Sequence, residues 1–97
     1  MKTIEIHIFG RVQRVGFRAC IRKIASALNI TGTVVNVPDG SVKIYASGES
    51  ILLEKFISMI YSCPRAIVRD IRTAEIPFRE FSGFSILKTE DNISTEF

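Results

Sequence analysis

The chain has 97 residues, a length that makes one domain with a single core. Hydrophobic residues make up 46% and charged residues 24% of the chain, a balance that is ordinary for a soluble globular protein. The net charge of +3 is too small to indicate a nucleic-acid partner by itself. No apolar run approaches the ~20 residues that span a bilayer.

The first half of the chain predicts a strand, a helix and a hairpin. Residues 2–9 alternate isoleucine with polar side chains, which is typical of a strand with one buried face. Apolar residues recur at helical spacing over residues 17–28 and predict an amphipathic helix. Residues 31–37 and 42–47 read as two strands, and the Pro-Asp-Gly sequence of residues 38–40 favours a turn between them.

The second half predicts one more helix and two more strands. A helix start at residues 48–50 and an apolar stripe over residues 52–60 predict a helix that ends at Cys63 and Pro64. Charged side chains suggest that a strand over residues 66–74 lies at a sheet edge. Residues 84–88 form a short last strand, and the polar residues 89–97 are expected to be a frayed tail. This order predicts one α+β domain over residues 1–88. Its fold class is the ferredoxin-like βαββαβ sandwich with an extra short C-terminal strand and two helices on one face of an antiparallel sheet.

The segment between the first strand and the first helix carries the strongest functional signal. Residues 10–18 read GRVQRVGFR. A strand that turns at glycines into a helix leaves backbone N–H groups unpaired at the helix start, which is a favourable site for an anion. Arg18, in the first helical turn, adds a planar guanidinium suited to two phosphate oxygens. The segment therefore predicts a phosphate site that needs no metal.

Asn36 is the second candidate, at the end of the strand that precedes the turn. It shares a strand face with Val34, and asparagine is depleted from strands. Two interpretations stay open at this point. Asn36 either starts the turn into Pro38, where asparagine is common, or takes part in the phosphate site.

Together these features resemble the acylphosphatases, small enzymes that hydrolyse acyl phosphates to a carboxylate and inorganic phosphate. The family pattern G-x-V-Q-G-V-x-F-R is matched at Gly10, Val12, Gln13, Val15, Phe17 and Arg18. Further matches are Ala25, Leu28, residues 32–36, Asp39, Gly40, Val42, Gly48, Pro64 and residues 81–84. The resemblance covers about residues 3 to 88.

The resemblance implies a mechanism and its residues. Phosphate is held by the backbone N–H groups of Arg14, Val15, Gly16, Phe17 and Arg18. The Arg18 side chain also binds the phosphate, and Asn36 orients the attacking water. No metal, cofactor or covalent intermediate is needed. Because the sequence offers no side-chain base near the site, we expect the water to give its proton to the bound phosphate itself. We expect a monomeric, cytoplasmic hydrolase whose partner is a small acyl phosphate, without a nucleic-acid or membrane partner.

Arg14 departs from the family pattern, which has glycine at this place. If the position needs a positive φ, a side chain there costs about 1–2 kcal/mol. The arginine could add a contact to the phosphate, or it could distort the loop so that its N–H groups no longer converge. The alternative to an active enzyme is therefore a catalytically impaired module that binds phosphate or acyl phosphates.

The same element order also builds RNA-recognition modules, which stack bases on aromatic side chains of the two central strands. The strand over residues 42–47 offers only Tyr45. This supports the expectation of no nucleic-acid partner.

Three reactive side chains are expected to be structural. Cys20 and Cys63 show no C-x-x-C spacing and are expected to be reduced thiols, with Cys20 as a small core residue. His7 is expected to point outward from the first strand.

Overall fold

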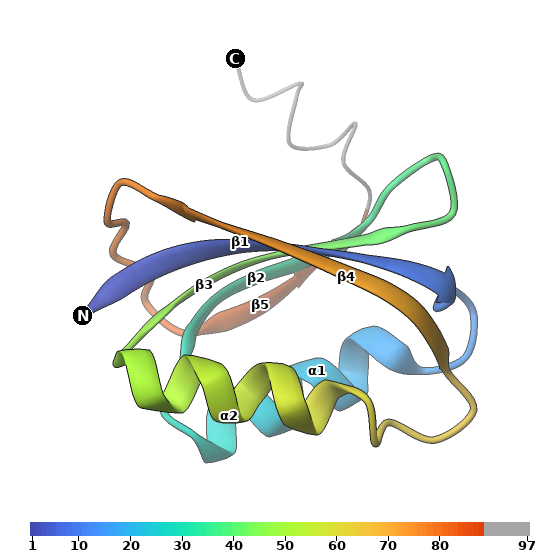
Figure 1. Cartoon of the computed structure of the whole chain (residues 1–97), viewed down its shortest axis with the longest axis horizontal. Helices are drawn as coiled ribbons and strands as arrows, with labels where there is room; N and C mark the ends of the chain where they lie inside the picture. The colour runs from blue at the N-terminus through green and yellow to red at the C-terminus, as the bar shows by residue number, and fades with distance from the viewer. Residues whose placement is uncertain (89–97) are drawn as a thin grey trace.

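The computed structural model describes residues 1–88; residues 89–97, expected to be a frayed tail, lie outside the described residues. Two helices cover one face of a five-stranded sheet (Figure 1). The elements are β1 (Lys2–Arg11), α1 (Phe17–Ala27), β2 (Thr31–Asn36), β3 (Val42–Gly48), α2 (Ser50–Ile60), β4 (Ile67–Ile76) and β5 (Phe84–Leu87). This order confirms the ferredoxin-like α+β class with an extra strand. Within residues 1–88, no helix has the length and apolar character needed to cross a membrane.

The sheet has the strand order β4-β1-β3-β2-β5. The pairs β1–β3, β1–β4 and β2–β3 are antiparallel, whereas β5 runs parallel to β2. The sheet is therefore mixed, and the expectation of a wholly antiparallel sheet was wrong. The reason lies in the connection through residues 77–83, which reverses the chain after β4. Because β2 also runs opposite to β4, the reversed chain meets β2 in parallel.

The core fills the space between the helices and the sheet. Its largest fully buried side chains are Phe17, Phe56, Ile6, Ile8, Ile21, Ile30, Ile44, Leu53, Ile60, Val12 and Val34. Two of these belong to the segment of residues 10–18 that the sequence marks as functional. Val12 is 1% exposed and Phe17 is 2% exposed, so both ends of the loop between β1 and α1 are pinned in the core. The loop itself is left at the surface, at the N-terminal end of α1.

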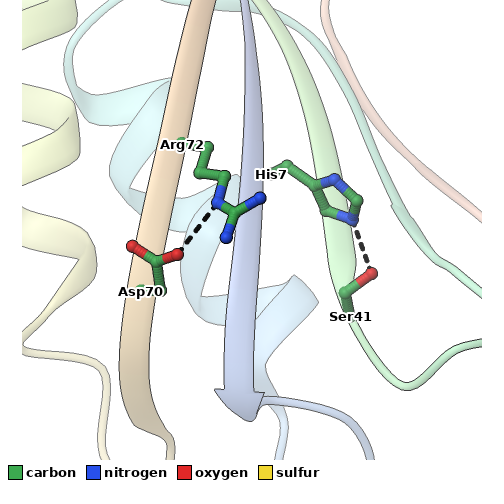
Figure 2. A network of polar contacts seen from close by, with 4 residues as sticks. All are labelled: His7, Ser41, Asp70 and Arg72. Carbon is green, nitrogen blue, oxygen red and sulfur yellow. Dashed lines mark hydrogen bonds and ion pairs between the residues drawn. The ribbon is translucent and has the colours of Figure 1, made fainter.

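The other face of the sheet carries polar contacts (Figure 2). His7 of β1 points outward, as expected, and its Nε2 lies 2.6 Å from the Oγ of Ser41. On β4, Arg72 Nε donates a hydrogen bond to Asp70 Oδ2 at 3.0 Å. These groups lie on the face of the sheet opposite the helices and contribute no side chain to the loop between β1 and α1.

Two aromatic side chains share this outer face. Tyr45 of β3 is the aromatic residue that the sequence indicated, and the structure shows that Phe9 of β1 lies on the same face. The guanidinium of Arg72 lies 5.2 Å from the ring centre of Phe9, and that of Arg79 lies 5.1 Å from the ring centre of Tyr45. Arginines of the same chain therefore cover both rings, and the absence of a nucleic-acid partner stays a prediction.

Cys20 and Cys63 form a disulfide, with their Cα atoms 6.0 Å apart. The expectation of two reduced thiols was wrong. Cys20 lies on α1, and Cys63 follows the end of α2, where its N–H bonds to the carbonyl of Ile60. The helices pack against the same face of the sheet (Figure 1), and this packing brings together two residues that are 43 positions apart. Helix packing sets this pairing, and the spacing along the chain does not reveal it.

Candidate functional site

Gly10 directs the chain from β1 into the loop. It has φ 136° and lies at a β-bulge after Phe9. A Cβ at this position would lie 2.1 Å from the carbonyl oxygen of Ile67, so a side chain cannot fit here. The close approach of β4 therefore requires glycine and fixes the direction in which the loop leaves the sheet.

The start of α1 offers a run of free backbone donors. Gly16 is the N-cap in the left-handed conformation (φ 74°), no side chain caps the helix, and its first turn has no acidic residue. The bond from Cys20 N–H to Gly16 O, at 3.2 Å, opens the helical pattern. Within residues 1–88, the N–H groups of residues 14–19 donate to no protein acceptor. Free N–H groups at the positive end of a helix dipole favour an anion.

A cavity of about 180 Å³ opens at this helix start. Its lining residues are Val12, Arg14, Gly16, Phe17, Arg18, Ala19, Asn36 and Ile86. The structure thus brings together Arg18 and Asn36, the two side chains that the resemblance assigns to catalysis. Four of the five residues expected to hold phosphate through their backbone line the cavity, whereas Val15 does not. Both charged lining residues are arginines, so the cavity favours an anionic ligand.

Arg18 is half-buried and held in place by the last strand. Its Nη1 donates a hydrogen bond to the carbonyl oxygen of Leu87, at 2.9 Å. A guanidinium has five N–H donors, so most of them remain for a ligand. No local pattern in the sequence indicated this contact, because it joins residues 69 positions apart.

Asn36 is the last residue of β2, and its Oδ1 is buried without a hydrogen-bond donor among the described residues. Leaving such an atom unpaired costs about 1–3 kcal/mol. The turn after β2 is closed by other groups, namely the bonds Val37 N–H to Ser41 O, Gly40 N–H to Val37 O and Ser41 N–H to Asp39 Oδ1. The Asn36 side chain takes no part in the turn, so the turn-starting interpretation does not explain it.

Gln13 anchors the loop to the β2–β3 turn. Its Nε2 donates hydrogen bonds to the carbonyl oxygens of Val37 and Ser41, both at 2.8 Å. The same turn follows Asn36 directly. Gln13 therefore fixes the position of the loop relative to the end of β2. The sequence pattern did not reveal this role, although Gln13 belongs to the motif.

Arg14 has the positive φ that would explain the glycine of the family pattern at this place. It adopts φ 62°, in the left-handed region, where a side chain costs about 1–2 kcal/mol. Its side chain is exposed, lines the cavity and makes no hydrogen bond or ion pair within residues 1–88. The loop thus keeps a backbone conformation that suits glycine and carries an additional cation.

Arg65 is a third arginine beside the loop, and the sequence did not indicate it. It follows α2 and Pro64, and it also has a positive φ of 67°. A Cβ placed on Gly16 would lie 3.4 Å from Arg65 Nη2, so this guanidinium lies against the loop. Arg65 is absent from the cavity lining and therefore approaches the loop from outside.

Comparison with known proteins identifies the family of this chain. The family model described as Acylphosphatase matches residues 4–86. The chain belongs to the acylphosphatase family. A curated acylphosphatase of Latilactobacillus sakei is 44% identical over 82 residues, which cover 84% of this chain and 89% of that protein. One of Archaeoglobus fulgidus is 41% identical over 87 residues, which cover 89% of this chain and 98% of that protein.

The fold of a solved acylphosphatase also matches. The crystal structure of the Bacillus subtilis acylphosphatase superposes with a TM-score of 0.86 at 34% identity, covering 90% of this chain and 99% of that chain. The family model and the solved structure therefore agree on the acylphosphatase family. Among residues 1–88 of this acylphosphatase-family chain, no three His, Cys, Asp or Glu side chains gather where they could share a metal ion.

Proposed function

We propose that the protein is an active acylphosphatase, which hydrolyses the carboxyl–phosphate bond of acyl phosphates to a carboxylate and inorganic phosphate. One observation supports this most strongly. A single small cavity joins free backbone donors at a helix start, the half-buried guanidinium of Arg18 and the unpaired Oδ1 of Asn36. The first two suit a phosphate, and the third suits a water molecule beside it.

The proposed reaction uses these groups in one displacement. The backbone N–H groups and Arg18 hold the phosphoryl oxygens and stabilise their charge as it develops. Asn36 Oδ1 accepts a hydrogen bond from water and aims the water oxygen at phosphorus. The new P–O bond forms as the bond to the acyl oxygen breaks, and its electron pair leaves on the carboxylate. The water proton passes to a phosphate oxygen, so no side-chain base is required.

We propose that the enzyme needs neither metal nor cofactor. The positive charge that phosphoryl transfer requires is available from the helix start and from Arg18, and each charge-assisted hydrogen bond contributes about 1.5–3 kcal/mol. We also keep the expectations of a monomer and a small acyl phosphate partner. The expected cytoplasmic location stays a prediction, and the Cys20–Cys63 disulfide counts against it because cytosolic thiols are kept reduced.

The test is hydrolysis of benzoyl phosphate by wild type, Arg18→Ala and Asn36→Ala, with Arg11→Ala as control. Arg11 is exposed and does not line the cavity. Loss of two charge-assisted bonds from Arg18 lowers kcat/KM by about 100-fold or more, and loss of one bond from Asn36 lowers kcat by about 10- to 100-fold. Equal rates in wild type and both site variants would refute the assignment.

The second candidate is a module that binds phosphate without turnover. It is favoured by the left-handed backbone of Arg14 at a place where the family has glycine. A calorimetric titration with inorganic phosphate, run beside the hydrolysis assay, separates the two functions. Binding without hydrolysis in wild type, together with hydrolysis in Arg14→Gly, would establish this second candidate.

A further inference from the structure

We propose that Arg14 makes this site selective for acyl phosphates whose acyl group carries a second negative charge, such as a carboxylate. This selectivity rests on the proposed function and adds the substrate class. The two arginines that line the cavity differ in their surroundings. Arg18 is half-buried and tied to the carbonyl of Leu87, whereas Arg14 is exposed and has no partner within residues 1–88.

This difference places the two charges at different depths. The phosphate is held in the inner part of the cavity, by the helix start and by Arg18. Arg14 lies at the exposed edge, where the acyl part of a substrate leaves the cavity. A guanidinium at that edge contributes little to a neutral acyl group, but it can bind a carboxylate through two parallel hydrogen bonds.

The rest of the lining supports the same assignment. Among residues 1–88, no carboxylate lines the cavity to neutralise Arg14, and the apolar lining residue Ile86 is half-buried. This apolar side chain suits the uncharged part of an acyl group. A strained conformation at a functional site points to a role for the residue that adopts it, and Arg14 keeps a left-handed backbone.

Arg65 provides the matched control. Its guanidinium lies against Gly16 but does not line the cavity, so its charge acts on the loop as a whole. Arg65 therefore favours the phosphate of every substrate alike, whereas Arg14 discriminates between acyl groups. Neutralising each arginine in turn separates discrimination between acyl groups from a general effect of positive charge on phosphate binding.

The test compares 4-carboxybenzoyl phosphate with 4-carbamoylbenzoyl phosphate, which have the same shape and differ by one charge. At low ionic strength, wild type prefers the carboxylate by about fivefold in kcat/KM, the scale of an exposed ion pair, and added salt reduces the preference. Arg14→Gln and Arg14→Gly lower this ratio to a common value. Arg65→Gln lowers kcat/KM for both substrates and leaves the ratio unchanged.

Two results would overturn the proposal: equal ratios in wild type and Arg14→Gln, or a ratio that Arg65→Gln lowers as much as Arg14→Gln does. Comparing ratios between variants cancels the different leaving-group strengths of the two substrates. If no substrate is hydrolysed, the proposed function fails. The selectivity is then tested separately by calorimetry with the two matching benzoylphosphonates, whose equal affinities for wild type would refute it.

Discussion

Removing the Cys20–Cys63 disulfide should destabilise the protein strongly. The bond closes a loop across a sequence separation of 43. Loop-closure entropy for a loop of this length amounts to about 4 kcal/mol at 25 °C. For a chain of 97 residues, whose unfolding entropy is about 0.2 kcal/mol/K, this lowers Tm by about 20 °C. The perturbation is either reduction with dithiothreitol or the double variant Cys20→Ser with Cys63→Ser.

The assay is urea unfolding followed by far-UV circular dichroism, for the oxidised protein, the reduced protein and the double variant. The last two should unfold at the same, lower urea concentration. Neither cysteine lines the cavity, so hydrolysis of benzoyl phosphate well below both midpoints should be unchanged. Coincident unfolding curves for oxidised and reduced protein would refute the entropic reasoning. Two free thiols in the denatured, unreduced protein would show that the bond is absent.

Further predictions concern the loop, the turn and the metal requirement. Arg14→Gly relieves the left-handed strain of the folded chain but also increases the conformational freedom of the unfolded chain, which opposes the gain. Urea unfolding should therefore show a variant more stable than wild type by between zero and about 1 kcal/mol, and a clear destabilisation would contradict this. Gln13→Ala loses the bonds to Val37 and Ser41 and should lower kcat for benzoyl phosphate by about 100-fold, the effect of a shift near 1 Å; an unchanged kcat would show that the loop needs no anchor. Hydrogen bonds from the Ser41 side chain and backbone lower the pKa of the exposed Asp39 carboxyl. Its stabilising effect is therefore present above the ordinary pKa of 3.8 and is lost as the pH falls through the lowered pKa, so Asp39→Asn should unfold with less acid dependence than wild type over that range. EDTA should leave the hydrolysis rate of dialysed enzyme unchanged, and restoration of a lost rate by added Mg²⁺ would contradict metal independence.

Local patterns predicted the elements and much of the candidate site. Alternating isoleucines indicated β1, and the helical spacing of apolar residues indicated α1 from its first residue, Phe17. The glycines and Arg18 indicated an anion site between these elements. These features could be found because strand alternation, helix periodicity and a free helix start each depend on residues that are close in sequence.

The remaining features depend on segments that meet only after folding. The parallel direction of β5 follows from the reversal through residues 77–83, and the disulfide follows from the packing of α1 beside α2. Arg65 reaches Gly16 from the far end of α2, and Arg18 bonds to Leu87 on the last strand. None of these pairs has a signature in residue type or spacing, so the sequence could not indicate them.

The central claim is that water attacks phosphorus at the site formed by the loop and Arg18. Hydrolysis of benzoyl phosphate in water enriched in oxygen-18 tests this claim most directly. Water aimed by Asn36 should place the label in inorganic phosphate and leave benzoate unlabelled. The Asn36→Ala variant should slow this labelled turnover without changing the position of the label. Label in benzoate would show attack at the acyl carbon instead, and would contradict the proposed role of this site.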